Sequence, residues 1–213
     1  MDEYTRPNPE QAALLTIDTQ NDFTLPDASA RIPGTADAVP QMERLVEAFR
    51  SEARPVIHVV RLYREDGSNV DQCRRQAIED GAEIVRPGTE GAELVAELKP
   101  SGSMSLDATQ LLEGTFQEIG SNEWILYKPR WGAFYSTDLD DFLSERSVNT
   151  VIVCGCNFPN CPRTTVYEAS ERDYRIVFVP DATSKTYNRG LDELENIGVA
   201  LMDTEETIEW ITE

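Results

Sequence analysis

The sequence predicts an α/β fold built on a parallel sheet. Short apolar runs rich in β-branched residues alternate along the chain with segments whose apolar residues recur at helical spacing. This alternation is typical of parallel strands joined by helical crossovers. Several runs are continuously apolar, which indicates strands buried on both faces of the sheet. No repeat, low-complexity segment or break in composition divides the chain, so we expect one domain over residues 1–213.

The first half of the chain is expected to contribute two strands and three helices. Apolar runs at residues 12–17 (AALLTI) and 55–62 (PVIHVVRL) are bounded by polar segments, which is typical of buried strands. Residues 35–50 place apolar side chains on one helical face, and shorter helices are predicted at residues 70–79 and 90–98.

The second half continues this alternation after an irregular segment. Residues 100–120 have no clear periodicity and are interrupted by glycines, so we expect a lid or an oligomer contact there. The remaining predicted elements are, in chain order, a strand at 124–127, a helix at 138–146, a strand from Thr150, a helix from Cys161, a strand at 175–180, a helix at 190–198, a strand at 199–202 and a helix at 205–211.

Polar residues follow several predicted strands at the point where each strand ends. Asp18, Lys128, Gly155 and Asp181 each occupy such a position. Ligand sites of open parallel sheets lie outside the carboxyl ends of the strands, at a topological switch point. We therefore expect Asp18, Lys128 and the turn after Gly155 to share one edge of the sheet.

The stretch from Thr150 to Ser170 (TVIVCGCNFPNCPRTTVYEAS) has the pattern of a strand, a tight turn and a helix. It places Cys161 at the start of the helix, with Pro162 at the first helical position, where its missing N–H is tolerated. Unpaired N–H groups and the helix dipole favour a thiolate there, so we predict a lowered pKa and a nucleophilic Cys161. Cys154, inside the strand, is interpreted as a buried structural cysteine.

A cysteine, an aspartate and a lysine at one edge are sufficient for acyl transfer. Cys161 would attack a carbonyl carbon, while Asp18 would act as general base and then as general acid. Lys128 would keep the thiolate and the carboxylate ionised together. Backbone N–H groups of the turn after Gly155 would stabilise the oxyanion. The only histidine, His58, is interpreted as a core residue, so we expect neither a metal site nor a cofactor.

Composition narrows the classes of partner and compartment. The four cysteines have no spacing typical of a disulfide framework, the acidic N-terminus is unlike a signal peptide, and no apolar run approaches a membrane span. We therefore expect a cytoplasmic protein. The net charge of -20 argues against nucleic acid or a membrane as partner. The chain has only three lysines, and its acidic residues are spread along its whole length. Its surface is either an ordinary acidic surface or one adapted to a high-salt cytoplasm. We favour adaptation to high salt.

Four motifs give the chain a resemblance to a known family: LLTIDTQNDF (14–23), YKPRWGAFYSTDLDDFL (127–143), VIVCGCNFPNCPRTTVYEAS (151–170) and VFVPDATS (177–184). They resemble the isochorismatase-like cysteine hydrolases, which include nicotinamidases and N-carbamoylsarcosine amidases. The resemblance implies a Rossmann-like three-layer α/β/α sandwich with a six-stranded parallel sheet. It implies Asp18 as base, Lys128 as charge stabiliser and Cys161 as nucleophile. It also implies a cis peptide between Cys156 and Asn157, an oxyanion bound by the N–H groups of Asn157 and Cys161, and a homo-oligomer.

Departures from the family's patterns refine the expected reaction. The metal-binding Asp-x-His pattern of nicotinamidases is missing from residues 58–69, which disfavours that activity. True isochorismatases lack the nucleophilic cysteine, so Cys161 favours cleavage of an amide, carbamoyl or ureido C–N bond of a small molecule. Two alternatives stay open. One is a non-catalytic or redox-responsive ligand-binding protein that uses Cys156 and Cys161, and the other is a hydrolase of a different acyl bond, such as an ester or imide.

Side chains beside the strand ends are candidates for a substrate pocket. Aromatic residues could form an apolar wall, and basic or hydroxyl groups leaving the second strand could bind a substrate carboxylate, bidentately if an arginine does so. Arg64 is a further candidate of the second kind, beside Arg61 and Tyr63. The candidate pocket residues are Phe23, Arg61, Tyr63, Trp131, Phe134 and Cys156.

Overall fold

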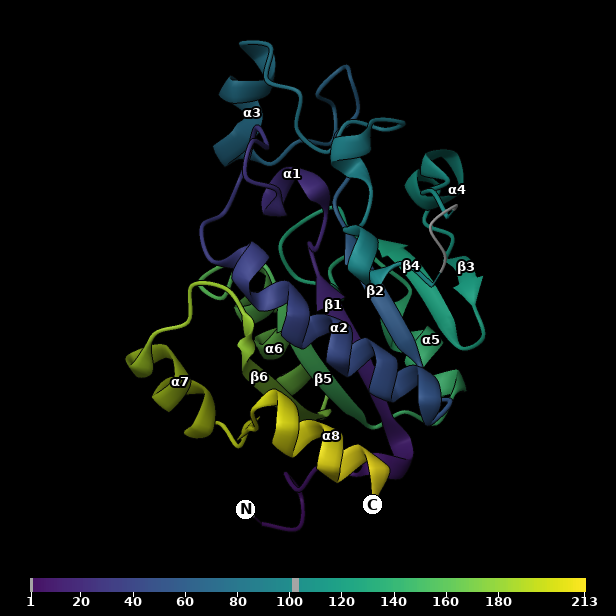
Figure 1. Cartoon of the computed structure of the whole chain (residues 1–213), viewed down its shortest axis with the longest axis vertical. Helices are drawn as coiled ribbons and strands as arrows, with labels where there is room; N and C mark the ends of the chain where they lie inside the picture. Colours follow the sequence, from purple (N-terminus) through teal and green to yellow (C-terminus); the bar gives the residue numbers. More distant parts are fainter. Residues whose placement is uncertain (1, 101–103) are drawn as a thin grey trace.

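In the computed structural model, which describes residues 2–100 and 104–213, seven strands form one central sheet (Figure 1). Their spatial order is β3-β4-β2-β1-β5-β6-β7, and every neighbouring pair is parallel except β3 and β4. The expected six parallel strands are present, but the antiparallel edge strand β3 makes the six-stranded prediction wrong. The strands are β1 (Ala12–Ile17), β2 (Val56–Val60), β3 (Gln117–Gly120), β4 (Glu123–Tyr127), β5 (Thr150–Gly155), β6 (Arg175–Thr183) and β7 (Ala200–Leu201).

Helices cover both faces of this sheet, as a three-layer sandwich requires. The long helix α2 packs with α8 against one face, and α5 and α6 cover the other (Figure 1). The α-helices are α1 (Asn21–Thr24), α2 (Thr35–Ser51), α3 (Gln72–Glu79), α4 (Ala108–Leu112), α5 (Leu139–Glu145), α6 (Cys161–Ser170), α7 (Asn188–Glu195) and α8 (Thr204–Thr212), and short 3-10 helices span Pro9–Gln11, Glu90–Ala92 and Ala96–Leu98.

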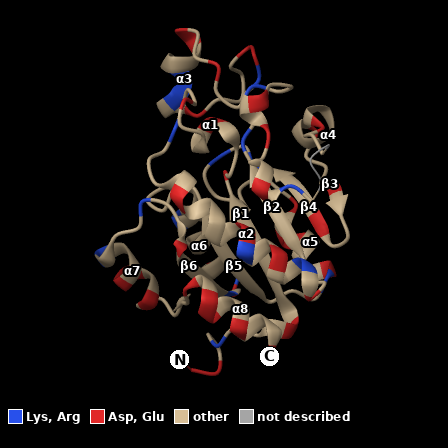
Figure 2. Ribbon diagram, viewed as in Figure 1, with Lys and Arg blue, Asp and Glu red and all other residues tan. Residues whose placement is uncertain are grey.

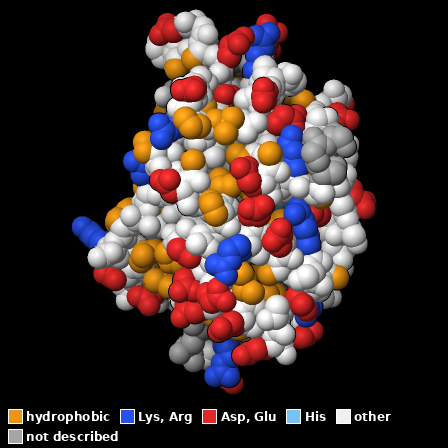
Figure 3. Space-filling model, in the orientation of Figure 1, with side chains coloured by type: hydrophobic (Ala, Val, Ile, Leu, Met, Phe, Trp, Pro, Cys, Tyr) orange, Lys and Arg blue, Asp and Glu red, His pale blue; other side chains and the backbone are white. Residues whose placement is uncertain are grey.

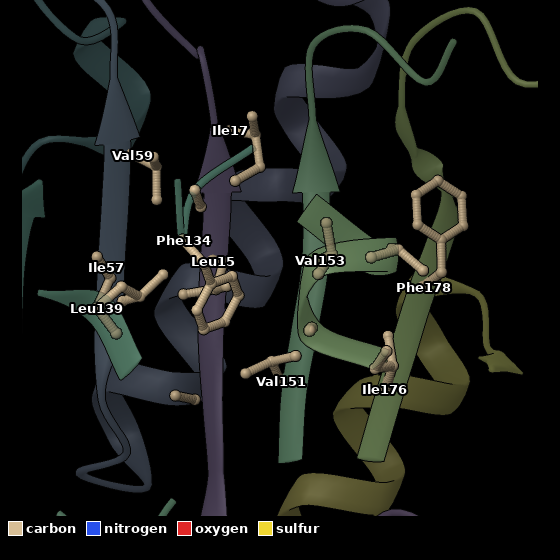
Figure 4. Close-up of a cluster of buried hydrophobic side chains, with 14 of the residues drawn as sticks. Leu15, Ile17, Ile57, Val59, Phe134, Leu139, Val151, Val153, Ile176 and Phe178 are labelled. Atoms are coloured by element: carbon tan, nitrogen blue, oxygen red, sulfur yellow. The ribbon is translucent and has the colours of Figure 1, made fainter. Parts of the chain in front are cut away.

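Alternate residues of the central strands face opposite layers. Leu15 and Ile17 of β1 point into the cluster beneath α5 and α6, together with Val153 and Phe178 (Figure 4). Leu14 points the other way, into the cluster beneath α2. Because both faces are covered, β1 has no exposed side, and burial of each such side chain contributes roughly 1.5–3 kcal/mol. This confirms the interpretation of continuously apolar runs as fully buried strands.

The chain order of the strands creates a switch point beside β1. From β1 the chain moves outward through β2 to β4, whereas from β5 it moves in the opposite direction through β6 to β7. Connections from adjacent β1 and β5 therefore separate at their carboxyl ends, which leaves a crevice for a site. Helices α1 and α3 lie at this end, opposite the two termini (Figure 1), and a third apolar cluster that includes Phe23, Leu62 and Leu94 supports them.

The segment predicted to be irregular contains two regular elements. Helix α4 and strand β3 lie within residues 100–120, of which 101–103 are outside the described residues. Strand β3 is only half-buried, and Ile119 is its one apolar side chain, so the sequence carries no strand periodicity there. The helix predicted at 190–198 is Asn188–Glu195, so it begins two residues and ends three residues before the predicted bounds.

Charged side chains are spread over the surface, with acidic ones in excess. Figure 2 shows Asp and Glu on most of the outer helices, and in Figure 3 acidic side chains gather over the region occupied by α8. This helix carries Glu205, Glu206 and Glu209. Among the described helices, none combines the length and the apolar character that a membrane crossing needs.

Candidate active site

Asp18 and Lys128 form a buried ion pair at the carboxyl ends of β1 and β4. The Lys128 ammonium donates a hydrogen bond to Asp18 Oδ2 at 2.9 Å, and the Lys128 side chain is fully buried. The backbone of Asp18 is left-handed, with φ of 51°, a conformation that aspartate tolerates better than most residues. Asp18 Oδ1 is buried and, within residues 2–100 and 104–213, has no hydrogen-bond partner. The carboxylate therefore keeps one acceptor available.

Cys161 reaches the same region through the turn that follows β5. Gly155 ends the strand with φ of 120°, and a Cβ there would lie 2.3 Å from the carbonyl oxygen of Ile17. Only glycine allows this approach of β5 to β1. The peptide between Cys156 and Asn157 is cis, as the family resemblance implies. Helix α6 begins at Cys161, so its proline occupies the second helical position rather than the predicted first.

A cavity of about 220 Å³ lies where these segments meet. It brings together Asp18, Cys161 and Asn157. The backbone N–H groups of Asn157 and Cys161 donate to no group in the described part of the chain, so both are available to a ligand. Five of the six predicted pocket residues line it, namely Phe23, Arg61, Tyr63, Trp131 and Cys156.

Phe134 is the predicted pocket residue that lies elsewhere. Its side chain is buried in the cluster beneath α5 and α6, with its ring centre 5.6 Å from that of Tyr174 (Figure 4). The reason is the backbone of the loop, because the Phe134 N–H donates to Glu168 Oε2 of α6 at 2.9 Å. This bond turns Phe134 into the core, whereas Trp131 stays at the cavity with 42% of its surface exposed.

Arg61 lines the cavity, but its charge already has a partner. The guanidinium forms a buried ion pair with Asp71, and it also donates to Tyr63 Oη at 3.2 Å. Tyr63 Oη in turn donates to Asp71 Oδ2 at 2.8 Å. Arg61 is therefore part of a closed network, which does not favour it as the free anchor for a substrate carboxylate. Arg64 is absent from the residues that line this cavity and borders a separate hollow.

The electrostatic environment of Cys161 differs from the prediction. Burial and the nearby Asp18 charge raise the pKa of the Cys161 thiol to about 12, and the opposing effect of Lys128 is smaller. The helix dipole and Lys128 were expected to lower the pKa of Cys161. Desolvation of the thiol depends on tertiary packing, so the sequence does not reveal it. At neutral pH the thiol is therefore protonated, and a nearby base is needed to take its proton. Cys154 is fully buried, which confirms its interpretation as a structural residue.

His58 belongs to a separate network in the core. Its Nδ1 pairs with Thr16 Oγ1 and its Nε2 with Glu123 Oε1, both at 2.8 Å. Arg50 completes the network through an ion pair with Glu123. The core interpretation of His58 is confirmed. Among the residues that the structure describes, no three His, Cys, Asp or Glu side chains form a group that could hold a metal ion.

Comparison with known proteins identifies the family. Residues 12–206 match the family described as the isochorismatase domain. The chain belongs to the isochorismatase family. Its relatives include a protein of Arabidopsis thaliana named a "probable inactive nicotinamidase", which is 33% identical. The alignment covers 88% of this chain and 89% of that protein. A solved isochorismatase family protein of Desulfovibrio vulgaris is 32% identical, with a TM-score of 0.80 and coverage of 95% of this chain and 99% of that one.

A relative of named activity is more distant within the isochorismatase family. The N-carbamoylsarcosine amidase of an Arthrobacter species is 26% identical over 166 residues, which cover 78% of this chain and 56% of that protein. These comparisons confirm the family resemblance drawn from the motifs. They also include a relative whose name marks it as inactive, so membership of the isochorismatase family establishes the scaffold more firmly than the reaction.

Sequence reasoning missed several residues of this isochorismatase-family cavity. They include the α3 residues Cys73 and Arg74, together with Asp71, which precedes that helix. The helix itself was predicted, but its polar sequence has no face that indicates where it packs. Its position over the cavity follows from the loops around it, and no local signal in the sequence encodes that placement.

Proposed function

We propose that this protein is a cysteine hydrolase that cleaves an amide, carbamoyl or ureido C–N bond of a small molecule. One observation carries the proposal: the buried Asp18 carboxylate, held by Lys128 and with no hydrogen-bond partner for Oδ1 among the described residues, shares a cavity with the Cys161 thiol. Asp18 is near enough to Cys161 for its charge to raise the thiol pKa. This is the arrangement of a general base beside a nucleophile that needs deprotonation.

In the first step, the Cys161 Sγ–H bond breaks and its proton passes to Asp18 while sulfur attacks the carbonyl carbon. The C=O electron pair moves to oxygen. The N–H groups of Asn157 and Cys161, which have no acceptor within the described residues, are suited to bind that oxyanion. When the intermediate collapses, the C–N bond breaks. Asp18 returns the proton to the leaving nitrogen, so ammonia or an amine departs and a thioester on Cys161 remains.

In the second step, water hydrolyses the thioester. Asp18 takes a proton from the water, whose oxygen attacks the acyl carbon, and the C–S bond then breaks. The proton returns to the sulfur, which restores the thiol. Lys128 donates its hydrogen bond to Oδ2, so Oδ1 is the carboxylate oxygen placed to take and return the proton. Every step uses side chains of this chain and a water molecule.

Two further observations support the assignment. A cavity of about 220 Å³ is suited to a small molecule and leaves little room for a polymer. One relative in the family is named N-carbamoylsarcosine amidase, whose name describes cleavage of a carbamoyl C–N bond. The same nucleophile could attack an ester or an imide, so these compounds belong in the same substrate panel.

The proposal is tested with amides, ureido acids, esters and imides, measured by release of ammonia or acid, and by intact-protein mass spectrometry. We expect turnover of a C–N substrate and a trapped acyl adduct on Cys161. Cys161→Ala should abolish both, whereas Cys73→Ala, which alters an exposed cysteine at the same cavity, should retain both. An adduct that persists on Cys161→Ala protein would show that the nucleophile is a different cysteine.

A second candidate function is redox-responsive ligand binding without catalysis. It is favoured by the 33% identity to a relative named as inactive, and by the presence of both Cys156 and Cys161 at the cavity. This candidate predicts reversible oxidation of these thiols by peroxide and no turnover of any compound in the panel. Turnover that is lost in Cys161→Ala protein rules it out.

A further inference from the structure

Arg74 is a charged group of the cavity that the proposed reaction does not use and that forms no ion pair among the described residues. Arg74 lies on α3, is half-buried and lines the cavity. Its guanidinium carbon is 5.1 Å from the centre of the Phe23 ring, whose side chain is buried. In the described ranges of the chain, no carboxylate lies within 4.0 Å of this guanidinium, and its N–H groups donate to no protein acceptor.

The other charges at the cavity cancel in pairs. Asp18 pairs with Lys128, and Asp71 pairs with Arg61. Within the described part of the chain, Arg74 therefore leaves an uncompensated positive charge at the cavity, although the net charge of the protein is -20. Figure 2 shows this basic part of α3 at the end of the molecule where the site lies. A cation in this position, in so acidic a protein, points to an anionic ligand.

The packing of Arg74 suits recognition of a planar anion. Stacking against the Phe23 ring restrains one face of the guanidinium and leaves its N–H edges available. Arginine presents a fork of donors that matches the two oxygens of a carboxylate. The guanidinium is also close enough to act on groups deep in the cavity, because its charge opposes the effect of burial on the pKa values of Tyr63 and Cys156.

We propose that Arg74 binds a carboxylate of the substrate. The substrate class would then be a short carboxylic acid that carries an amide, carbamoyl or ureido group, with the carboxylate at Arg74 and the C–N bond at Cys161. This inference rests on the proposed hydrolase function for its reactive group. The inference specifies that the substrate carries a negative charge, and it assigns the selection of that charge to Arg74.

The test compares charged and neutral compounds of similar shape in wild-type protein and in Arg74→Gln. The pairs are succinamate with butanamide, and 3-ureidopropionate with propylurea. We expect wild-type kcat/KM to favour the anionic member of at least one pair by tenfold or more. Arg74→Gln should lower that anionic kcat/KM by about 10- to 100-fold, mainly through KM, because a charge-assisted bond is lost. The neutral value should change less than about threefold, and Arg74→Lys should be intermediate because it keeps the charge but loses the fork.

Arg75→Gln is the matched control. Arg75 is the next residue of α3 and is also half-buried, but it does not line the cavity. Its substitution changes the net charge by the same amount, so its effect on the anionic substrates should stay below about threefold. An equal loss in Arg75→Gln and Arg74→Gln would overturn the proposal, because the effect would then belong to the overall field.

A binding experiment separates this inference from the proposed function. Calorimetry with Cys161→Ala protein measures the affinity for succinamate and 3-ureidopropionate without turnover, alone and combined with Arg74→Gln. At least tenfold weaker binding in the combined variant supports the role of Arg74, even if the wild-type protein hydrolyses none of the compounds. The inference fails if neutral compounds are hydrolysed as fast as anionic ones and Arg74→Gln changes neither the ratio of their kcat/KM values nor the affinity for the anionic compounds. The hydrolase proposal would still stand in that case.

Discussion

The two oxygens of Asp18 have different surroundings. Oδ2 accepts a hydrogen bond from Lys128, whereas buried Oδ1 has no partner within the described residues. The large majority of buried side-chain polar atoms in proteins are paired, so an unpaired carboxylate oxygen beside a cysteine marks a group that is held ready for a ligand or a proton. The buried ammonium stabilises the charged carboxylate at a depth where an isolated charge would be costly.

The Cys161 thiol provides a prediction about pH. Its pKa is raised from the ordinary 9.0 to about 12, so the thiolate becomes abundant only at strongly alkaline pH. In Cys73→Ala protein, iodoacetamide should alkylate Cys161 roughly 100- to 1000-fold more slowly at pH 8 than a free thiol of pKa 9.0, since the thiolate is the reactive form. Peptide mass spectrometry should show a rate that still rises at pH 10. A plateau near pH 7 would mean that the resting residue is a thiolate.

Residues that follow strand ends were the most predictable part of the site. Asp18, Lys128 and Cys161 could be placed together because the carboxyl ends of parallel strands share one edge. The direction of Phe134 could not be predicted, because it depends on a hydrogen bond to Glu168 from a distant helix. The pairing of Arg61 with Asp71 likewise requires two loops to meet, and short-range patterns carry no signal of that meeting.

At the scale of elements, the network around Glu123 joins the start of β4 to β2 and to the end of α2. Arg50 forms two hydrogen bonds with the carboxylate, and His58 forms a third contact from the opposite side. Burial acts to raise the pKa of Glu123, but the bonds from Arg50 and His58 outweigh burial and lower it to about 2. The charged form therefore binds its neighbours more strongly in the folded state than in the unfolded chain.

Substitution of Glu123 should make stability less dependent on acid. Because the folded pKa is depressed from 4.5 to about 2, the stabilisation is fully present above pH 4.5 and is lost as pH falls toward 2. Glu123→Gln should destabilise the protein by about 3 kcal/mol at pH 6 and by much less near pH 2.5. Urea unfolding at several pH values measures this difference. If Glu123→Gln lowers the free energy of unfolding by the same amount at pH 6 and at pH 2.5, the assignment of the lowered pKa to Glu123 is contradicted.

The predictability of each element followed its burial. Strands β1, β2 and β5 are covered on both faces, so their apolar runs identify them from the sequence alone. Strand β3 lies at the edge of the sheet, and its pairing with β4 contains an irregular register. Such a strand depends on backbone pairing with its neighbour more than on its own side chains, so its short polar sequence resembles a loop.

At the scale of the whole molecule, the excess of acidic residues is the dominant electrostatic feature. The chain has 39 acidic residues and 19 basic ones. Repulsion among them opposes the compact state, and dissolved ions screen it, since the Debye length falls from about 10 Å at 0.1 M salt to about 3 Å at 1 M. Salt should therefore stabilise this fold more than it stabilises a protein of balanced charge.

Thermal unfolding in KCl tests this expectation. We expect the melting temperature to rise by about 2–8 °C between 0.1 M and 2 M KCl, which corresponds to roughly 1–2 kcal/mol for a protein of this size. Sucrose at matched osmolality serves as the control, because it does not screen charge. A melting temperature that falls or stays constant in KCl would indicate that the acidic surface is not adapted to high salt.

The pairing of β1 with β5 determines when the site can first exist during synthesis. Strand β1 ends at Ile17. Its neighbour β5 is synthesised only after on the order of 130 further residues, and Cys161 follows β5. At ribosomal rates of about 5–20 residues per second, roughly 7–30 seconds separate the synthesis of Asp18 from that of Cys161. During that interval one edge of β1 stays unpaired and open to wrong partners. A chain that stalls before β5 would therefore carry an unpaired strand edge and would lack Cys161.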